Sequence, residues 1–180
     1  PRSTLFPYTT LFLSPAGLLK GEPVGGLGAV KRSERVGFLF QDPERQLFHS
    51  TVRDEVLFSL RNTALPREER ERRLSASLDE TGLTGKEGCH PLDLNSAERR
   101  MVALASLGIR EPDLLLLDEP TRELDAVWLA RFERWLANRR AAVLAISHDP
   151  AFVSRIFSRV WHLKEGHLEN SFSRAPGGDT

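Results

Sequence analysis

The sequence predicts an α/β fold built on a mostly parallel sheet. Segments of strand composition alternate with segments of helical periodicity over most of the 180 residues, and the strands at 113–117 and 142–146 are apolar on both faces. Strands of that composition are buried on both sides, as in parallel sheets that are covered by helices. Alternating strands and helices also favour right-handed crossovers between parallel neighbours.

The composition fits one domain and limits the classes of function. Lys plus Arg and Asp plus Glu number 25 each, so the formal net charge is zero. Proteins that coat nucleic acid usually carry a basic surplus, so we expect no nucleic-acid partner. The single cysteine, Cys89, allows no disulfide framework and favours a reducing compartment. No apolar run reaches the ~20 residues that span a bilayer.

Two strands and a capped helix are expected in the N-terminal half. Residues 17–24 and 35–40 have strand composition and are separated by a Gly-rich turn. Residues 51–62 predict a helix, because Thr51 can cap its first turn and Asp54 places a carboxylate near its positive end.

Two more helices are expected before the apolar strand at 113–117. Pro66 suits the first turn of a helix, and Gly82 suits the position after its last residue, Thr81. A Gly-rich loop then leads into a helix at about 95–107.

The C-terminal part predicts an amphipathic helix, a strand, a short helix and a hairpin. These elements are expected at 126–138, 142–146, 151–157, and 159–164 paired with 167–169, followed by a flexible tail at 171–180. The amphipathic helix has one broad apolar face, formed by Val127, Leu129, Phe132, Trp135 and Leu136.

Polar side chains with possible catalytic roles follow the first of the two apolar strands. Leu114–Leu117 lead directly into Asp118 and Glu119. Ligands of parallel sheets bind at the carboxyl ends of the strands, so both carboxylates are expected at that edge. An acid there can hold Mg²⁺, and a second acid can orient or deprotonate an attacking water. The alternative is a polar turn after a core strand.

A second polar strand end follows residues 142–146. The strand leads into Ser147, His148 and Asp149. A histidine at that position can donate a hydrogen bond to a γ-phosphate or hold the attacking water. The alternative is an ordinary surface histidine in a loop.

Taken in order, these motifs resemble the ATPase domain of ABC transporters over residues 17–169. The matching segments are FLFQDPERQLF (38–48) for the Q-loop, LNSAERR (94–100) for the signature, LLLLDEP (114–120) for Walker B, Leu124-Asp125 for the D-loop and His148 for the switch histidine. The resemblance implies ATP as substrate and Mg²⁺ bound by Asp118. It implies that Gln41 contacts Mg²⁺ and the attacking water, and that Glu119 and His148 are catalytic.

The signature segment departs from the family pattern of Leu-Ser-Gly-Gly-Gln. Asn95 replaces the serine, Ser96 and Ala97 replace the glycines, and Glu98 replaces the glutamine. In the family this segment binds the nucleotide of the opposite subunit through a helix N-terminus, and the resemblance carries that role to these four residues and to Asp125. Because Ala97 adds a Cβ where close backbone approach is needed, we expect a weakened signature.

The run QDPERQLF, followed by Thr51-Val52, is similar to ATPases of energy-coupling factor importers and of cobalt or nickel importers. That branch implies a homo- or heterodimer with a second ATPase subunit, at the cytoplasmic face of the cell membrane as a peripheral protein. It also implies import of a metal ion or vitamin, a helical subdomain at about 50–108, and docking of a membrane subunit near Glu44–Val52.

The phosphate-binding loop of the family, GxxxxGK[ST], does not occur in the sequence. The nearest segment, GGLGAVK at 25–31, has Val30 where the motif needs glycine. PRSTLFPYTTLF, residues 1–12, resembles the conceptual translation of a sequencing adapter. We therefore expect residues 1–14 not to be biological, treat 1–16 as non-native, and interpret 17–170 as a partial ATPase domain.

Two other classes of protein were weighed. A non-hydrolysing pseudo-ATPase that docks on a membrane or ATPase partner is consistent with the altered signature. A DNA-repair or chromosome-organising ABC protein would carry a long coiled coil between the Q-loop and the signature. The segment between Gln41 and Ser96 is short and has no sustained heptads, which argues against that class.

Overall fold

The computed structural model describes residues 35–164 and 167–173. The predicted strand at 17–24, the turn after it and the segment 1–16 lie outside this range, as do residues 174–180. The chain divides into two units, 1–146 and 147–180, and each is described by itself.

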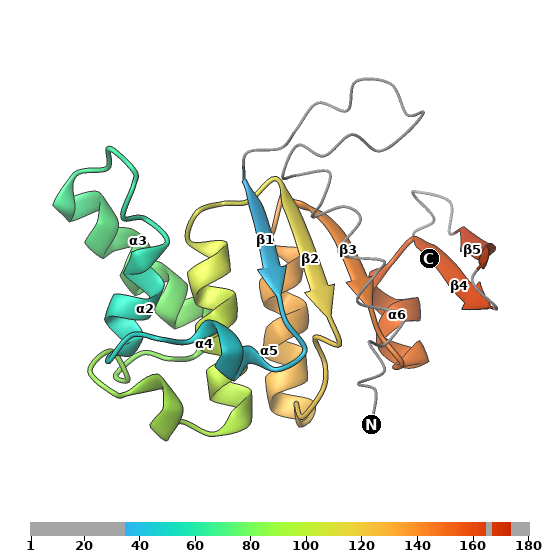
Figure 1. Ribbon diagram of the computed structural model, residues 1–180, viewed down its shortest axis with the longest axis horizontal. Coiled ribbons are helices and arrows are strands. Elements are labelled where there is room, and N and C mark those ends of the chain that lie inside the picture. The colour runs from blue at the N-terminus through green and yellow to red at the C-terminus, as the bar shows by residue number, and fades with distance from the viewer. Residues whose placement is uncertain (1–34, 165–166, 174–180) are drawn as a thin grey trace, which may run out of the picture. The chain divides into compact units, whose positions relative to one another are not determined.

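The first unit is built on a three-stranded parallel sheet. Strands β1 (Val36–Leu39), β2 (Leu114–Asp118) and β3 (Ala142–Ile146) are hydrogen-bonded in that order (Figure 1). Leu39 of β1 pairs with Leu117 of β2. Because all three strands are parallel, their carboxyl ends lie at the same edge. The predicted α/β class with a parallel sheet is confirmed.

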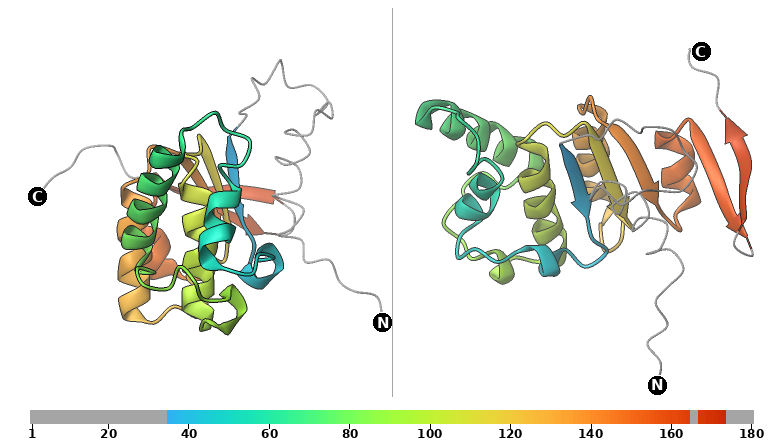
Figure 2. Two further views of the ribbon diagram at one scale, coloured as in Figure 1. Left: turned by 90° about the vertical axis from the view of Figure 1, so that its left-hand side faces the viewer. Right: turned by 45° about the horizontal axis from the view of Figure 1, so that its top comes forward.

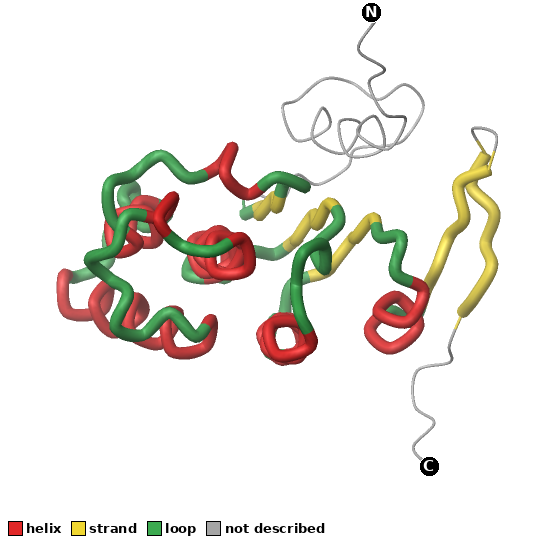
Figure 3. The backbone as a smooth tube through the Cα atoms, turned by 90° about the horizontal axis from the view of Figure 1, so that it is seen from below, coloured by secondary structure: helices red, strands yellow, loops and turns green. Residues whose placement is uncertain are grey.

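Helices α4 (Ser96–Gly108) and α5 (Ala126–Ala137) lie on one side of this sheet (Figure 3). The buried apolar side chains of the sheet and these two helices include Leu39, Met101, Val102, Leu104, Leu115, Leu116, Leu117, Phe132, Trp135 and Leu136. Burying each such side chain contributes about 1.5–3 kcal/mol. A Cβ at Gly37 of β1 would lie 2.9 Å from Leu115 Cδ2, so glycine makes room for this side chain of the neighbouring strand β2.

Helices α2 (Val52–Phe58) and α3 (Arg67–Thr81) pack with α4 beside β1 (Figure 2). The caps are those expected: the Thr51 side chain accepts a hydrogen bond from the N–H of Asp54 at 3.0 Å, and Gly82 ends α3 with φ of 75°. The division of this unit into subdomains stays a prediction.

The helix predicted to reach residue 62 ends earlier, at Phe58. The N–H groups of Leu60 and Arg61 donate to the carbonyl oxygens of Leu57 and Phe58, three residues back. Bonds of that spacing tighten the chain into turns, so the α-helix does not continue. Two single 3₁₀ turns, Pro43–Gln46 and Pro91–Asp93, complete the connections of the first unit.

The second unit contains helix α6 (Pro150–Ile156) and an antiparallel pair, β4 (Arg159–Lys164) with β5 (His167–Ser173). The hairpin was predicted, although its second strand is longer than the predicted segment 167–169. Among the described residues, no helix is long and apolar enough to cross a membrane.

Candidate functional site

Asp118 is the last residue of β2 and is half-buried. Burial raises the pKa of its carboxyl group, and the negative charges of Glu119 and Asp42 raise this pKa further. The ionised form is therefore disfavoured in the isolated chain. A cation placed beside Asp118 would relieve that cost, which is the electrostatic condition for a metal ligand.

Glu119 begins a tight turn immediately after the strand. Its N–H donates to the carbonyl of Ile146 at 2.9 Å, and its φ of 45° lies in the left-handed region. Non-glycine residues adopt that conformation at a cost of about 1–3 kcal/mol and concentrate at functional sites. The turn ends at Asp125, whose carboxylate accepts hydrogen bonds from the N–H groups of Val127 and Trp128, both at 2.9 Å, and so caps α5.

The loop after β1 carries Gln41, whose side chain is exposed. The amide of Gln46 holds the start of this loop: Oε1 accepts from the N–H of Phe40 at 2.9 Å, and Nε2 donates to the carbonyl of Phe38 at 2.6 Å. Arg100 of α4 holds the next residue, since its Nη2 donates to the Gln41 carbonyl at 3.0 Å. The main chain around Gln41 is thus fixed by one side chain from the loop itself and one from α4.

The far end of that loop is held by a buried carboxylate. Glu55 of α2 is 3% exposed, and its Oε2 accepts from the N–H groups of Phe48 and His49, both at 2.8 Å. The Phe48 ring is 67% exposed and meets the edge of the Phe58 ring at a centroid distance of 5.3 Å. The loop therefore presents aromatic surface on a fixed backbone.

The predicted signature residues form the start of α4. Asn95 is its N-cap: its side chain accepts from the N–H of Glu98 at 2.9 Å, and Glu98 Oε2 accepts from the N–H of Asn95 at 3.2 Å. This reciprocal pair is a capping box. Burial raises the pKa of Glu98, but its ion pair with Lys86 and the Asn95 N–H outweigh that effect and lower it. Asn95 and Ser96 remain accessible, whereas Ala97 and Glu98 are buried.

A polar cavity of about 310 Å³ lies between the loop after β1 and the start of α4. It brings together residues that the sequence analysis selected separately, Gln41 and Ser96. Its lining consists of Gln41, Asp42, Pro43, Glu44, Arg45, Ser96, Arg99, Arg100 and Glu123.

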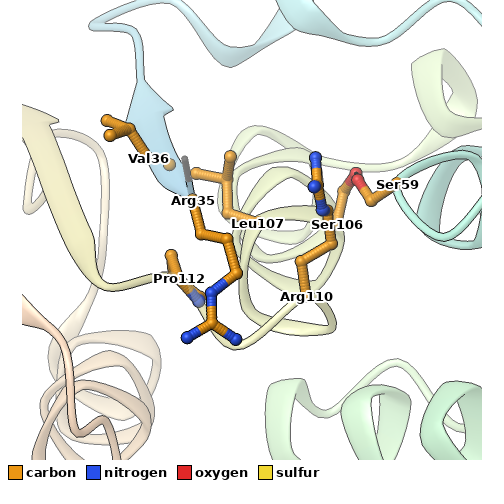
Figure 4. Close-up of a pocket in the computed structure, with 8 residues that line it drawn as sticks. Arg35, Val36, Ser59, Ser106, Leu107, Arg110 and Pro112 are labelled. Atoms are coloured by element: carbon orange, nitrogen blue, oxygen red, sulfur yellow. The ribbon is translucent and has the colours of Figure 1, made fainter. Parts of the chain in front are cut away.

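A second cavity, of about 100 Å³, lies at the amino end of β1 and contains none of the predicted residues (Figure 4). Arg35 and Arg110 contribute to its wall, and the Arg35 guanidinium pairs with Asp113 at 2.6 Å. Strand polarity places it away from the carboxyl ends, where the candidate site lies.

Comparison with known proteins identifies the family. The sequence model described as ABC transporter matches residues 2–122. The chain belongs to the ABC transporter family. The match begins inside the segment that we interpret as non-native, and the origin of that segment stays a prediction.

Two curated relatives place this ABC family chain near the predicted branch. It is 35% identical over 175 residues to the energy-coupling factor transporter ATP-binding protein EcfA of Methanothermobacter thermautotrophicus, covering 93% of the chain and 56% of that protein. It is 32% identical over 175 residues to the EcfA protein of Methanocaldococcus jannaschii, covering 93% and 63%. The chain thus spans a little over half the length of these relatives.

One solved structure supports the same branch of the family. CbiO1 of Clostridium perfringens, described as part of the ABC transporter complex cbiONQ, superposes with a TM-score of 0.67 at 30% identity, over 76% of this chain and 56% of that one. The predicted resemblance to the energy-coupling factor and cobalt branch is confirmed by these matches.

His148 belongs to the second unit of the ABC family chain. Its side chain is exposed, and it lies between Ser147 and Asp149, which caps α6 by accepting from the N–H groups of Ala151 and Phe152 at 3.0 and 3.1 Å. The role of His148 stays a prediction.

Three residues that hold the site were not selected from the sequence: Gln46, Glu55 and Arg100. Gln46 lies inside the quoted Q-loop segment but directly after the polar residues Glu44 and Arg45, so nothing local distinguished its side chain as a brace. Arg100 lies in the quoted signature segment beside Arg99 and looks like a solvated charge there. Arg100 is 1% exposed, and burial lowers the pKa of its guanidinium.

Proposed function

We propose that this chain is the ATP-binding and ATP-hydrolysing part of a subunit that powers an ABC importer for a metal ion or vitamin. The observation that carries the proposal is the carboxylate pair Asp118-Glu119 at the end of β2, beside the Gln41 loop at the end of β1. The likeness to two EcfA proteins and to cbiO1 supports this class of transporter.

The proposed roles follow from the chemistry of each side chain. Asp118 and the Gln41 amide oxygen supply the hard oxygen donors that suit Mg²⁺, which proteins commonly bind through one or two carboxylates together with substrate phosphates. When bound, Mg²⁺ would offset the charge of the phosphates. Glu119 orients or deprotonates the attacking water, and His148 donates to the γ-phosphate.

The proposal includes a second ATPase subunit. Asn95 and Ser96 at the N-terminus of α4 are accessible, and a helix N-terminus of this kind favours phosphate. We propose that they face the nucleotide of the partner. Ala97 and Glu98 would act indirectly, by shaping the first turn of α4. Asp125 would also act indirectly, by fixing the start of α5.

We also propose a membrane subunit as partner, docked near Glu44–Val52, with the chain peripheral at the cytoplasmic face. The exposed Phe48 ring and the partly exposed Phe58 ring provide apolar surface there. Such surface on a backbone fixed by Glu55 needs little reordering when a partner binds. Replacing Phe48 with Ala is expected to weaken co-purification with the membrane subunit, while Asn62→Ala, at an exposed position nearby, serves as a control.

The test of hydrolysis begins with the native gene, sequenced across the region upstream of residue 17. If its product carries GxxxxGK[ST], Glu119→Gln in that product should bind MgATP and lose turnover. Unchanged turnover would remove Glu119 from the mechanism. The 180-residue chain is expected to bind a fluorescent ATP analogue weakly or not at all, and micromolar affinity would contradict that expectation.

The alternative is a non-hydrolysing subunit that docks on a membrane or ATPase partner. The observation favouring it is the altered signature, in which Glu98 is buried in an ion pair with Lys86. A native product without the loop that still co-purifies with an active ATPase would support this alternative.

A further inference from the structure

One buried guanidinium connects the ends of two neighbouring strands. Arg100 of α4 donates from Nη2 to the Gln41 carbonyl at 3.0 Å and from Nη1 to the Glu119 carbonyl at 3.3 Å. Gln41 follows β1 and Glu119 follows β2, so the fork of Arg100 spans the two segments that carry the proposed Mg²⁺ and water ligands.

Burying the charged guanidinium of Arg100 costs free energy of desolvation. Arg100 is 1% exposed, and its Nε lies buried without a hydrogen-bond partner. An apolar side chain of similar volume often fills such a position at lower cost than a charge. The guanidinium differs from such a side chain in having a rigid planar fork, which fixes the separation of the two carbonyl groups that it binds.

A second link between these segments, in the described part of the chain, is an exposed ion pair. Arg122 of the turn after β2 lies 3.7 Å from Asp42 of the loop after β1, and both side chains are about half exposed. Exposed pairs of this kind contribute only about 0–1 kcal/mol. The buried fork is the stronger of the two links.

We propose that Arg100 is a positioning residue that couples the Gln41 loop to the Glu119 turn. The catalytic part of this proposal rests on the proposed function, in which Gln41 and Glu119 act on the same water. Its structural content is independent of that function: one side chain anchors both segments, so its loss should loosen both at once.

Hydrogen exchange of the 180-residue chain tests the coupling. In Arg100→Met, amides at 41–47 and 119–125 should both exchange about tenfold faster, as expected for the loss of a hydrogen bond worth about 1.4 kcal/mol. Amides of α3 and β3 should not change. Arg100→Lys keeps the charge without the fork and should restore one segment at most.

Arg99→Met is the matched control. Arg99 binds the Glu44 carboxylate at 2.7 Å and the Leu94 carbonyl at 2.6 Å, and among the described residues it forms no hydrogen bond or ion pair with the turn after β2. This variant should therefore speed exchange at 41–47 and leave 119–125 unchanged.

Two outcomes in Arg100→Met would overturn the proposal. Faster exchange in only one of the two segments of Arg100→Met would mean that they are not coupled. A uniform rise over the whole chain would mean that Arg100 serves general stability. If Arg100→Met does not fold, Arg100→Lys decides, since unchanged exchange in both segments would also refute coupling. No outcome depends on ATP turnover, so failure of the proposed function is distinguishable.

Discussion

The loop after β1 and the turn after β2 start side by side at one edge of the sheet, yet they are held in different ways. The turn after β2 closes on itself, because the N–H groups of Arg122 and Leu124 donate to the carbonyl groups of Glu119 and Thr121. The longer loop after β1, residues 40–51, also has two backbone bonds of that short range in the described part of the chain, at Arg45 and Leu47. Side chains of Gln46, Glu55 and Arg100 supply its other bonds. Apart from its bond to Arg100, the turn therefore has mostly local contacts, whereas the loop depends on helices α2 and α4 as well.

The largest expected effect comes from removing the buried brace of the loop after β1. Glu55→Ala leaves the N–H groups of Phe48 and His49 without their charged acceptor, so the free energy of unfolding should fall by about 2–3 kcal/mol. Chemical denaturation measures the loss, and trypsin should cut faster after Arg45. Glu68→Ala, at an exposed position of α3, is the control. A loss no larger than that of the control would contradict the dependence of this loop on Glu55.

A smaller effect is expected at the start of the same loop. Gln46→Leu removes two neutral hydrogen bonds, to the N–H of Phe40 and the carbonyl of Phe38, and should cost about 1–2 kcal/mol. Arg45→Ala changes an adjacent side chain that is 78% exposed, and should be nearly neutral in the same denaturation experiment. If the two variants were equally stable, the Gln46 amide would not hold the loop.

Removing the side-chain cap at the end of the turn after β2 should lower stability less than either change in the loop after β1. Asp125→Ala removes the cap of α5 and should lower stability by about 1 kcal/mol, whereas Asp125→Asn should retain most of the cap. Trypsin cleavage after Arg45 should stay at the wild-type rate in both variants. Faster cleavage after Arg45 would show that the cap of α5 also holds the loop after β1.

The smallest effect is a pH dependence at the end of β2. The folded chain raises the pKa of Asp118 above its ordinary value of 3.8, so the folded state binds this proton more tightly than the unfolded state. The resulting penalty is absent below pH 3.8, grows as pH rises from 3.8 toward the folded pKa, and is constant above it. Asp118→Asn should therefore gain melting temperature relative to wild type as pH rises through that window. A constant difference across pH would exclude ionisation of Asp118 as its cause.

The same contrast explains what the sequence could predict. The strand at 114–118 and the acids at its end lie within a few positions, so a short motif contains that pattern. The cap at Asp125 is also local but was assigned only as a nucleotide contact. The brace from Arg100 reaches Gln41 across 59 positions, and no periodicity relates the two. The Asn95 cap was local and was assigned only as a nucleotide contact, although Asn at 95 and Glu at 98 also match the spacing of a capping box.

The predicted end of α2 was wrong because the geometry of a turn determines it. Residues 59–62 have no strong helix breaker, and only the bonds that tighten the chain after Phe58 end α2 there. Burial of Arg100 was also beyond the sequence, since a charged residue beside Arg99 is ordinarily solvated. The candidate residues could be placed at the ends of the strands, but the contacts that hold them could not be assigned.

The pair formed by Lys86 and Glu98 has a consequence for protein engineering. Grafting the consensus Leu-Ser-Gly-Gly-Gln onto residues 94–98 would remove the carboxylate and leave the Lys86 ammonium half-buried opposite a neutral amide. The graft would therefore need a compensating change at position 86, twelve residues upstream of the last grafted position. Positions 86 and 98 are best exchanged together in any chimera made from this chain.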